Sequence, residues 1–189
     1  DMTNRWQGRV VRLRAVDPED WEAHYHWDQD SEMSGRLDFV WPPTSRARAR
    51  RWAEETSRQP DDDNLALEIE ALESGALVGH IGVHDSDRRI GSFSYGLAVL
   101  PEHQRRGYAS EAILLVARYF FQELRYQKVN AQVHSDNTPS LALHEKLGFA
   151  REGALRRMVY TGGQFYDLMY FGMTAEEFAA RYPELASAR

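Results

Sequence analysis

The sequence predicts a mixed α/β fold in which helices flank a central, twisted and mostly antiparallel sheet. Short segments of alternating apolar and polar residues meet at the turns 74–75 and 162–163, a pattern that is typical of antiparallel hairpins. A long amphipathic helix also connects a strand that ends near Val99 to a strand that begins near Lys128, as in a parallel crossover. Hairpins and one crossover together predict a mixed sheet covered by helices.

In the first half of the chain, local signals predict one strand, two helices and three further strands. Asp17 followed by a proline predicts the N-cap of the first helix, and Thr44 or Ser45 is expected to cap the second. An irregular, acidic and aromatic segment, 28–43, separates these helices, and a charged loop, 85–89, precedes the last strand. In chain order the elements are expected at residues 9–14, 18–27, 46–57, 65–70, 76–84 and 92–99.

In the second half, apolar residues at helical spacing follow Gly107 and predict the clearest helix of the chain. Gly148 predicts the end of a shorter helix, and Thr174 with Glu177 forms a capping box that begins the last one. The remaining elements are expected as helices at 109–124 and 140–146 and strands at 128–134, 150–160 and 164–171.

Composition restricts the class of protein. The 189 residues are expected to form one domain, 1–189, and a hydrophobic content of 42% is enough for a core. A net charge of -6 argues against nucleic-acid binding, which needs a basic surface. Since the chain has no cysteine, disulfides, thiolate nucleophiles and cysteine-ligated metals are excluded. No apolar segment reaches the roughly 18 residues of a membrane helix. We therefore expect a cytoplasmic protein with no membrane partner and no metal.

A pyrophosphate-binding site is predicted at residues 104–109, named here the phosphate loop. It consists of Gln104, Arg105, Arg106, Gly107, Tyr108 and Ala109. The loop lies between a strand and a helix N-terminus, whose free N–H groups and partial positive charge favour anions. Gly107 lets the backbone approach a phosphate, and the two arginines add charged donors. The alternative is an ordinary exposed basic helix cap, which has the same composition. The prediction therefore depends on the position of the loop between a strand and an amphipathic helix.

A second segment, 137–149, places Asn137 and Ser140 at a helix start and ends in Leu-Gly-Phe. Both residues are also ordinary helix caps. The two segments together resemble the GCN5-related N-acetyltransferases, and the resemblance extends from Val10 to about Phe171. It implies the fold of that family, acetyl-CoA as co-substrate and direct transfer of acetyl to a primary amine. The acceptor would be a peptide or protein N-terminal α-amine or the amine of a small molecule.

The resemblance also implies the contacts to the co-substrate. The phosphate loop would bind the CoA pyrophosphate, and Leu97 and Val99 would offer backbone groups to the pantetheine arm. Asn137 and Ser140 would bind the same arm. Backbone N–H groups near Val99 would stabilise the oxyanion of the reaction.

Candidate catalytic residues follow from a closer resemblance to the RimJ/RimL-type acetyltransferases of ribosomal-protein N-termini. It implies that Ser140 is the general acid that protonates the CoA thiolate. Many other members have a tyrosine where this chain has His144, which is the second candidate acid. Since the amine must lose a proton, Glu68, His80 and His84 are candidate bases, with Glu68 preferred and a water relay as the alternative. For the two histidines, a solvated strand face is the structural alternative.

The resemblance also implies that the irregular segment 28–43 and the hairpin at 161–164 flank the acceptor cleft. Candidate acceptor-binding residues are Asp28, Glu32, Asp38, Phe39, Trp41 and His84. The acids would attract a cationic amine, and the aromatic rings would form an apolar wall. The alternative is a loop that its aromatic side chains hold to the core while its acids face water.

A second functional hypothesis is a non-catalytic acyl-CoA-binding sensor or partner module. It is suggested by the absence of the tyrosine and predicts acetyl-CoA binding without turnover. Homodimers are frequent in the family, so a homodimer is an expectation from the resemblance alone.

Overall fold

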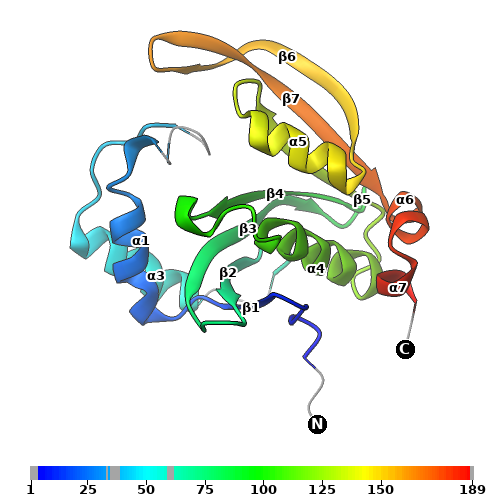
Figure 1. Cartoon of the computed structure of the whole chain (residues 1–189), viewed down its shortest axis with the longest axis horizontal. Helices are drawn as coiled ribbons and strands as arrows, with labels where there is room; N and C mark the ends of the chain where they lie inside the picture. Colours follow the sequence, from blue (N-terminus) through cyan, green and yellow to red (C-terminus); the bar gives the residue numbers. More distant parts are fainter. Residues whose placement is uncertain (1–3, 33, 35–38, 59–61, 188–189) are drawn as a thin grey trace. The chain divides into compact units, whose positions relative to one another are not determined.

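The computed structural model describes residues 4–32, 34, 39–58 and 62–187. Its α-helices and β-strands are labelled in Figure 1. In chain order the elements are β1 (Val11–Ala15), the 3-10 helix η1 (Pro18–Asp20), α1 (Trp21–Trp27), α3 (Arg46–Ser57), β2 (Ala66–Ala71), β3 (Leu77–Asp87), β4 (Ser92–Val99), the 3-10 helix η2 (Pro101–His103), α4 (Tyr108–Gln122), β5 (Lys128–His134), α5 (Thr138–Leu147), β6 (Ala150–Thr161), β7 (Gln164–Thr174), α6 (Ala175–Arg181) and α7 (Pro183–Ala186). Among these described helices, none is long and apolar enough to cross a bilayer.

Seven strands form one sheet in the order β1-β2-β3-β4-β5-β7-β6. β4 and β5 are parallel neighbours, and α4 connects them as expected for a crossover. The pairs β1–β2, β2–β3, β5–β7 and β6–β7 are antiparallel. The predicted fold class, a mixed and mostly antiparallel sheet with helices, is therefore confirmed.

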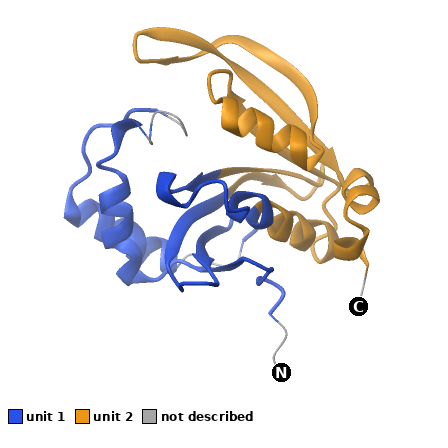
Figure 2. Cartoon of the chain, viewed as in Figure 1, with its two compact units in different colours: residues 1–82, 97–112 blue, residues 83–96, 113–189 orange. Residues whose placement is uncertain are grey.

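The chain divides into two compact units, which Figure 2 colours separately. The first comprises residues 1–82 and 97–112, and the second comprises residues 83–96 and 113–189. β3, β4 and α4 each contribute residues to both units. The phosphate loop belongs to the first unit and the segment 137–149 to the second, so each is described within its own unit. The expectation of a single domain stays a prediction.

In the first unit, the first turn of α4 holds the start of β1. The Glu111 carboxylate accepts the backbone N–H groups of Arg9, Val10 and Val11 at 2.6, 2.7 and 2.8 Å. A negative charge is favourable at this helix end because of the helix dipole. A Cβ at Gly8 would collide with the same carboxylate, so the close approach requires glycine there. One acidic side chain thus fastens β1 to the helix that follows the phosphate loop.

Glu111→Ala is expected to lower the free energy of unfolding by about 2–3 kcal/mol, since hydrogen bonds to charged groups contribute roughly 1.5–3 kcal/mol each. The N–H groups of Arg9 and Val10 are on exposed residues and can turn to water, whereas Val11 is fully buried. Urea unfolding of the variant measures the change. Glu54→Ala, at an exposed helical position in α3, is the control and should stay within about 0.5 kcal/mol of the parent. Equal effects of the two changes would contradict the role of Glu111.

An aromatic cluster forms the core of the second unit. Phe93 of β4 and Phe120 of α4 are fully buried, and their rings stack with centroids 4.0 Å apart. Tyr126 packs edge-on against both rings at 5.7 and 5.0 Å. Edge and offset geometries of this kind are the favourable arrangements of aromatic pairs. They fix the part of α4 in this unit against the beginning of β4.

The predicted hairpin turn at 162–163 is confirmed. Gly162 and Gly163 have φ values of 57° and 78°, as the central residues of a type I′ turn require. The predicted capping box is also present, because the Thr174 hydroxyl accepts from Glu177 N–H and the Glu177 carboxylate accepts from Thr174 N–H.

The charged loop expected at 85–89 is shorter than predicted, because β3 continues to Asp87. Asp85 adopts a left-handed φ of 51° within the strand. Aspartate tolerates this conformation better than most residues, since its short polar side chain bonds locally. The strand therefore passes through charged residues whose composition alone predicts a loop.

Candidate active site

The phosphate loop contains two residues with left-handed backbone. Arg105 and Gly107 both have positive φ, at 62° and 81°. Turns of this kind direct successive N–H groups toward one side. Gly107 takes the N-cap position of α4, since its carbonyl accepts the N–H of Glu111 at 3.1 Å. The free N–H groups of the first turn of α4 follow directly. The conformation of Arg105 costs a non-glycine residue roughly 1–2 kcal/mol, a strain that is typical of functional turns.

The phosphate loop contains one buried aromatic side chain and two exposed cationic side chains. Tyr108 is buried, whereas Arg105 and Arg106 are exposed. The Gln104 side-chain amide donates to the carbonyl of Val99 at 3.1 Å and closes the turn between β4 and the loop. A cavity of about 460 Å³ adjoins the loop and is lined by Arg9, Val10, Leu72, Glu73, Arg106 and Tyr108. The loop therefore presents two exposed cationic side chains beside the N-terminus of α4.

The end of β4 lies close to β3 within the first unit. Val99 is buried and Leu97 half-buried. A Cβ at Gly79 of β3 would collide with the carbonyl oxygen of Ala98, so glycine is required for this approach. The pantetheine contacts of Leu97 and Val99 stay predictions.

In the second unit, Asn137 and Ser140 shape the start of α5. The Asn137 side-chain oxygen accepts the N–H of Ser140 at 3.2 Å, and Gly148 ends the helix with a φ of 97°. The capping role considered for Asn137 is therefore present. Its contact with the co-substrate stays a prediction.

Three side chains of the second unit form a hydrogen-bonded chain, named here the Tyr95–His144–Ser140 chain. The Tyr95 hydroxyl lies 2.7 Å from His144 Nε2, and His144 Nδ1 lies 2.7 Å from the Ser140 carbonyl oxygen and 3.4 Å from its hydroxyl. A carbonyl only accepts, so Nδ1 carries the proton and Nε2 accepts from Tyr95. Burial raises the pKa of Tyr95 well above its ordinary value, which keeps the hydroxyl protonated as a donor.

The position of His144 disfavours its predicted role as a direct acid. Its side chain is buried, and both ring nitrogens are engaged within the protein. Burial lowers the pKa of His144, although the bond to the Ser140 carbonyl opposes this effect. The ring is therefore neutral and has no proton directed outward. By contrast, the half-buried Ser140 hydroxyl lies on the acceptor side of the Nδ1–H group, so its own proton is free to point elsewhere.

The buried His144 predicts a pH-dependent stability. Because its pKa is lowered on folding, the unfolded chain binds a proton below the ordinary value of 6.5 while the folded chain does not. The contribution of the neutral His144 to folding stability is therefore complete above pH 6.5, and it is lost as the pH falls toward the lowered pKa of the folded chain. The parent should therefore lose stability more steeply than His144→Gln between about pH 7 and pH 5.5, by at most about 1.4 kcal/mol per pH unit. Urea unfolding across this range measures the two slopes, and parallel slopes would contradict the prediction.

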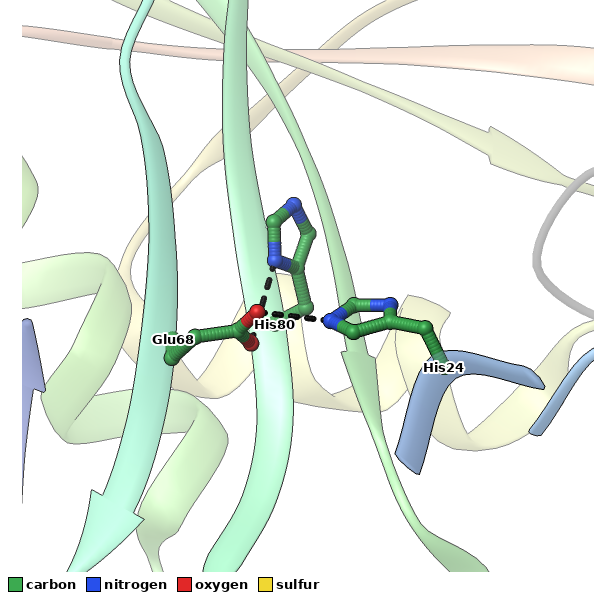
Figure 3. Close-up of side chains that lie close together, drawn as sticks. All are labelled: His24, Glu68 and His80. Carbon is green, nitrogen blue, oxygen red and sulfur yellow. Dashed lines mark hydrogen bonds and ion pairs between the residues drawn. The ribbon is translucent and has the colours of Figure 1, made fainter. Parts of the chain in front are cut away.

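In the first unit, Glu68 joins two histidines in the His24–Glu68–His80 cluster (Figure 3). Glu68 and His80 lie directly opposite each other in the β2–β3 ladder, and His24 comes from α1. His24 Nε2 lies 2.6 Å from one carboxylate oxygen and His80 Nδ1 lies 3.3 Å from the other. Burial by itself raises the pKa of Glu68, but the hydrogen bonds from His24 and His80 outweigh it and hold that pKa below its ordinary value.

This environment disfavours the predicted role of Glu68 as a direct base. Its side chain has no exposed surface, and an imidazole lies against each carboxylate oxygen, so neither oxygen is directed at solvent as a base that accepts a proton from an amine would be. His84, the other strand histidine, is exposed, with Nδ1 2.8 Å from the Asp85 carboxylate.

The described acceptor-side residues of the first unit are largely at the surface. Asp28 and Glu32 are exposed. The rings of Phe39 and Trp41 meet edge-to-face with centroids 6.0 Å apart, and Trp41 is 63% exposed. An exposed tryptophan does not hold its loop to the core, so that alternative does not describe Trp41. Asp38 lies outside the described residues.

Two participants in these clusters, Tyr95 and His24, were not predicted from sequence. Tyr95 lies in the strand expected at 92–99, where nothing in the sequence distinguishes it from Phe93 two residues earlier. His24 and His26 lie two residues apart on the same expected helix, and the sequence alone does not show which of them meets the sheet. Alternation with Leu67 and Ile69 places Glu68 on the opposite face of its strand, so the sequence gives no signal that this carboxylate is buried and needs partners.

Comparison with known proteins agrees with this geometry. Residues 11–150 match the acetyltransferase (GNAT) domain. The SPbeta prophage-derived uncharacterized N-acetyltransferase YokL of Bacillus subtilis (strain 168) is 43% identical over 173 residues, which cover 92% of this chain and 94% of that protein. A GCN5-related N-acetyltransferase from Brucella melitensis superposes with a TM-score of 0.76 at 26% identity, covering 96% of this chain and 81% of that one.

A second solved structure, spermidine N-acetyltransferase from Vibrio cholerae in complex with CoA and spermine, has a TM-score of 0.78 at 19% identity. It covers 89% of this chain and 97% of that one, and at this identity the likeness concerns the fold. The family match and the relative at 43% identity extend over most of the sequence. The chain therefore belongs to the GNAT acetyltransferase family and is an acetyl-CoA-dependent N-acetyltransferase, which transfers acetyl to an amine.

Proposed function

We propose that the enzyme passes the acetyl group directly from acetyl-CoA to a primary amine, with Ser140 as the general acid, as in the RimJ/RimL-type enzymes. The acceptor is an N-terminal α-amine or the amine of a small molecule. The observation that carries this proposal is the orientation of Ser140 by the neighbouring Nδ1–H of His144. A route through an acetylated cysteine is excluded, because the chain has none.

In this proposal the phosphate loop binds the CoA pyrophosphate. Its exposed arginines and the N–H groups at the start of α4 supply the donors. Backbone groups of Leu97 and Val99, with Asn137 and Ser140, bind the pantetheine arm. The left-handed conformation at Arg105 and Gly107 supports this assignment, since it shapes the loop before the ligand arrives.

The transfer balances without an enzymic base. The amine nitrogen bonds to the thioester carbonyl carbon, the carbon–sulfur bond breaks, and the Ser140 hydroxyl donates its proton to the departing sulfur. The proton that the amine loses passes to water, and water also restores the Ser140 proton. An α-amine, with a pKa of about 7.7–8.0, is partly neutral near neutral pH, whereas a lysine side chain near 10.4 is almost wholly charged. The enclosure of Glu68 therefore favours acceptors of low amine pKa.

Charge favours a cationic acceptor in the same proposal. The chain carries a net charge of -6, and Asp28 and Glu32 are exposed acids. Trp41 and Phe39 offer an aromatic wall, which also attracts cations, and His84 is assigned to the acceptor side. The Vibrio cholerae neighbour, whose structure holds spermine, is an example of this fold with a polycationic ligand. A cytoplasmic location and a homodimer stay predictions.

The decisive experiment combines calorimetric titration of acetyl-CoA with thiol release in the presence of different amines. The panel should contain peptides with free and blocked N-termini, amino acids, spermidine and an Nα-blocked lysine. We expect stoichiometric binding and thiol release that depends on a free amine, fastest with the α-amines of peptides and slowest with the blocked lysine, whose amine has the higher pKa. Binding without release from any amine would favour the acyl-CoA-binding sensor instead. Fastest release with the blocked lysine would overturn the proposed preference.

A further inference from the structure

We propose that the His24–Glu68–His80 cluster is a binding site for a divalent transition-metal ion of the zinc type. The three residues come from α1, β2 and β3, and all lie in the first unit. Their ligand atoms lie within 4.8 Å of one another. The proposal departs from the expectation of no metal, and it is independent of the acceptor and of the role of Ser140.

The backbone brings two of the ligands together before any metal arrives. Glu68 and His80 are directly opposed in the antiparallel β2–β3 ladder, where side chains of a pair share one face of the sheet. His24 reaches the same carboxylate from the helix. Its ring is held between Trp27 and Trp52, with centroid distances of 4.5 and 4.3 Å. Aromatic packing therefore restricts the His24 ring near the carboxylate.

The donor set suits a borderline metal ion. Two imidazole nitrogens and one carboxylate oxygen are the ligands of several zinc sites, and three protein ligands leave a fourth position for water. Tetrahedral ligands at zinc bond lengths lie about 3.3 Å from one another. His80 Nδ1 lies 3.3 Å from one Glu68 oxygen, which meets this value. His24 Nε2 lies 2.6 Å from the other oxygen, so bringing both imidazoles and the carboxylate onto one ion needs a small movement of the His24 ring and of the carboxylate.

Metal binding requires both histidines to change tautomer, while each imidazole stays neutral. A carboxylate only accepts, so without metal His24 Nε2 and His80 Nδ1 carry the protons that face Glu68. On binding, each ring protonates its other nitrogen and turns a lone pair toward the ion. Figure 3 shows that this other nitrogen of His80 points away from the carboxylate.

The burial pattern provides an entrance. The Glu68 side chain is 0% exposed, whereas His24 and His80 retain 14% and 22% of their side-chain surface. An ion can therefore enter past the imidazoles and meet the buried carboxylate last. Since one ligand is helical and two are in the sheet, the ion would join α1 to β2 and β3 and raise the unfolding temperature.

Competition of the tag-free, metal-stripped full chain with a chromophoric chelator for Zn²⁺ tests the proposal. We expect one equivalent to bind, a higher unfolding temperature with Zn²⁺, and the intense visible absorption of tetrahedral Co²⁺ when Co²⁺ replaces it. Glu68→Gln and His80→Gln should each weaken Zn²⁺ binding at least 30-fold. His26→Gln and His84→Gln alter exposed histidines outside the cluster and should leave the affinity for Zn²⁺ unchanged.

Folding of each variant is checked by its thermal transition without metal, and the stoichiometry of the parent chain does not depend on any variant. Failure of the parent to bind one equivalent would overturn the proposal. Equal weakening by the cluster variants and by the exposed-histidine variants would also overturn it, because it would assign the binding to surface histidines.

Discussion

Gly107→Asp is expected to weaken acetyl-CoA binding by at least about 100-fold, which corresponds to roughly 2.7 kcal/mol. Gly107 is the N-cap of α4 with a φ of 81° and open space around its Cα. A side chain there is strained by the left-handed backbone at a cost of about 1–2 kcal/mol. An aspartate also places a negative charge beside the proposed position of the CoA pyrophosphate and repels it. The repulsion adds to the backbone strain.

The same substitution leaves the fold in place, because aspartate is a favourable N-cap residue and compensates part of the backbone strain. Titration calorimetry gives the affinity, and thermal unfolding checks the structure. Gly107→Ala introduces the strain without the charge and should have a smaller effect. The matched control is Gly153→Asp in β6, where the space is also open but φ is not positive. Undiminished binding by Gly107→Asp would remove the phosphate loop from the co-substrate site.

The features that sequence predicted correctly are those set by neighbouring residues. The turn at Gly162-Gly163 requires two residues of positive φ, and glycine is the residue that adopts them most easily. The capping box at Thr174 depends on a residue three positions away. In both cases the decisive interaction is local, so a short stretch of sequence contains the information.

The clusters of the candidate site depend on contacts between distant residues. Tyr95 and His144 are separated by 49 positions, and His24 and Glu68 by 44. No spacing rule connects such pairs, since the strand register and the packing of a helix decide which side chains meet. For this reason the sequence indicated Glu68 and His144 as chemically important, but it assigned them to direct proton transfer. In the structure both side chains are buried, and their hydrogen bonds place Glu68 in the His24–Glu68–His80 cluster and His144 in the Tyr95–His144–Ser140 chain.

Ser140→Ala is expected to lower kcat by about 10–100-fold and to weaken acetyl-CoA binding by a smaller factor, since Ser140 is also proposed to contact the pantetheine arm. General acid catalysis usually contributes roughly 100- to 10,000-fold, but the leaving thiol has an ordinary pKa near 8.5 and needs only modest help at neutral pH. The helix start should persist, because Asn137 accepts the backbone N–H of residue 140 and not its hydroxyl. Thr138→Ala removes an exposed hydroxyl two residues earlier and is the control.

The Tyr95–His144–Ser140 chain gives this prediction a second, independent test. If His144 acts only by orienting the Ser140 hydroxyl, His144→Gln should lower kcat less than Ser140→Ala does. The double variant should then be no slower than Ser140→Ala alone, since residues that act as one unit are not additive. Multiplying losses would instead mean that His144 contributes to the reaction without Ser140. Because the His144 ring is neutral and both its nitrogens are engaged, the structure favours the non-additive result.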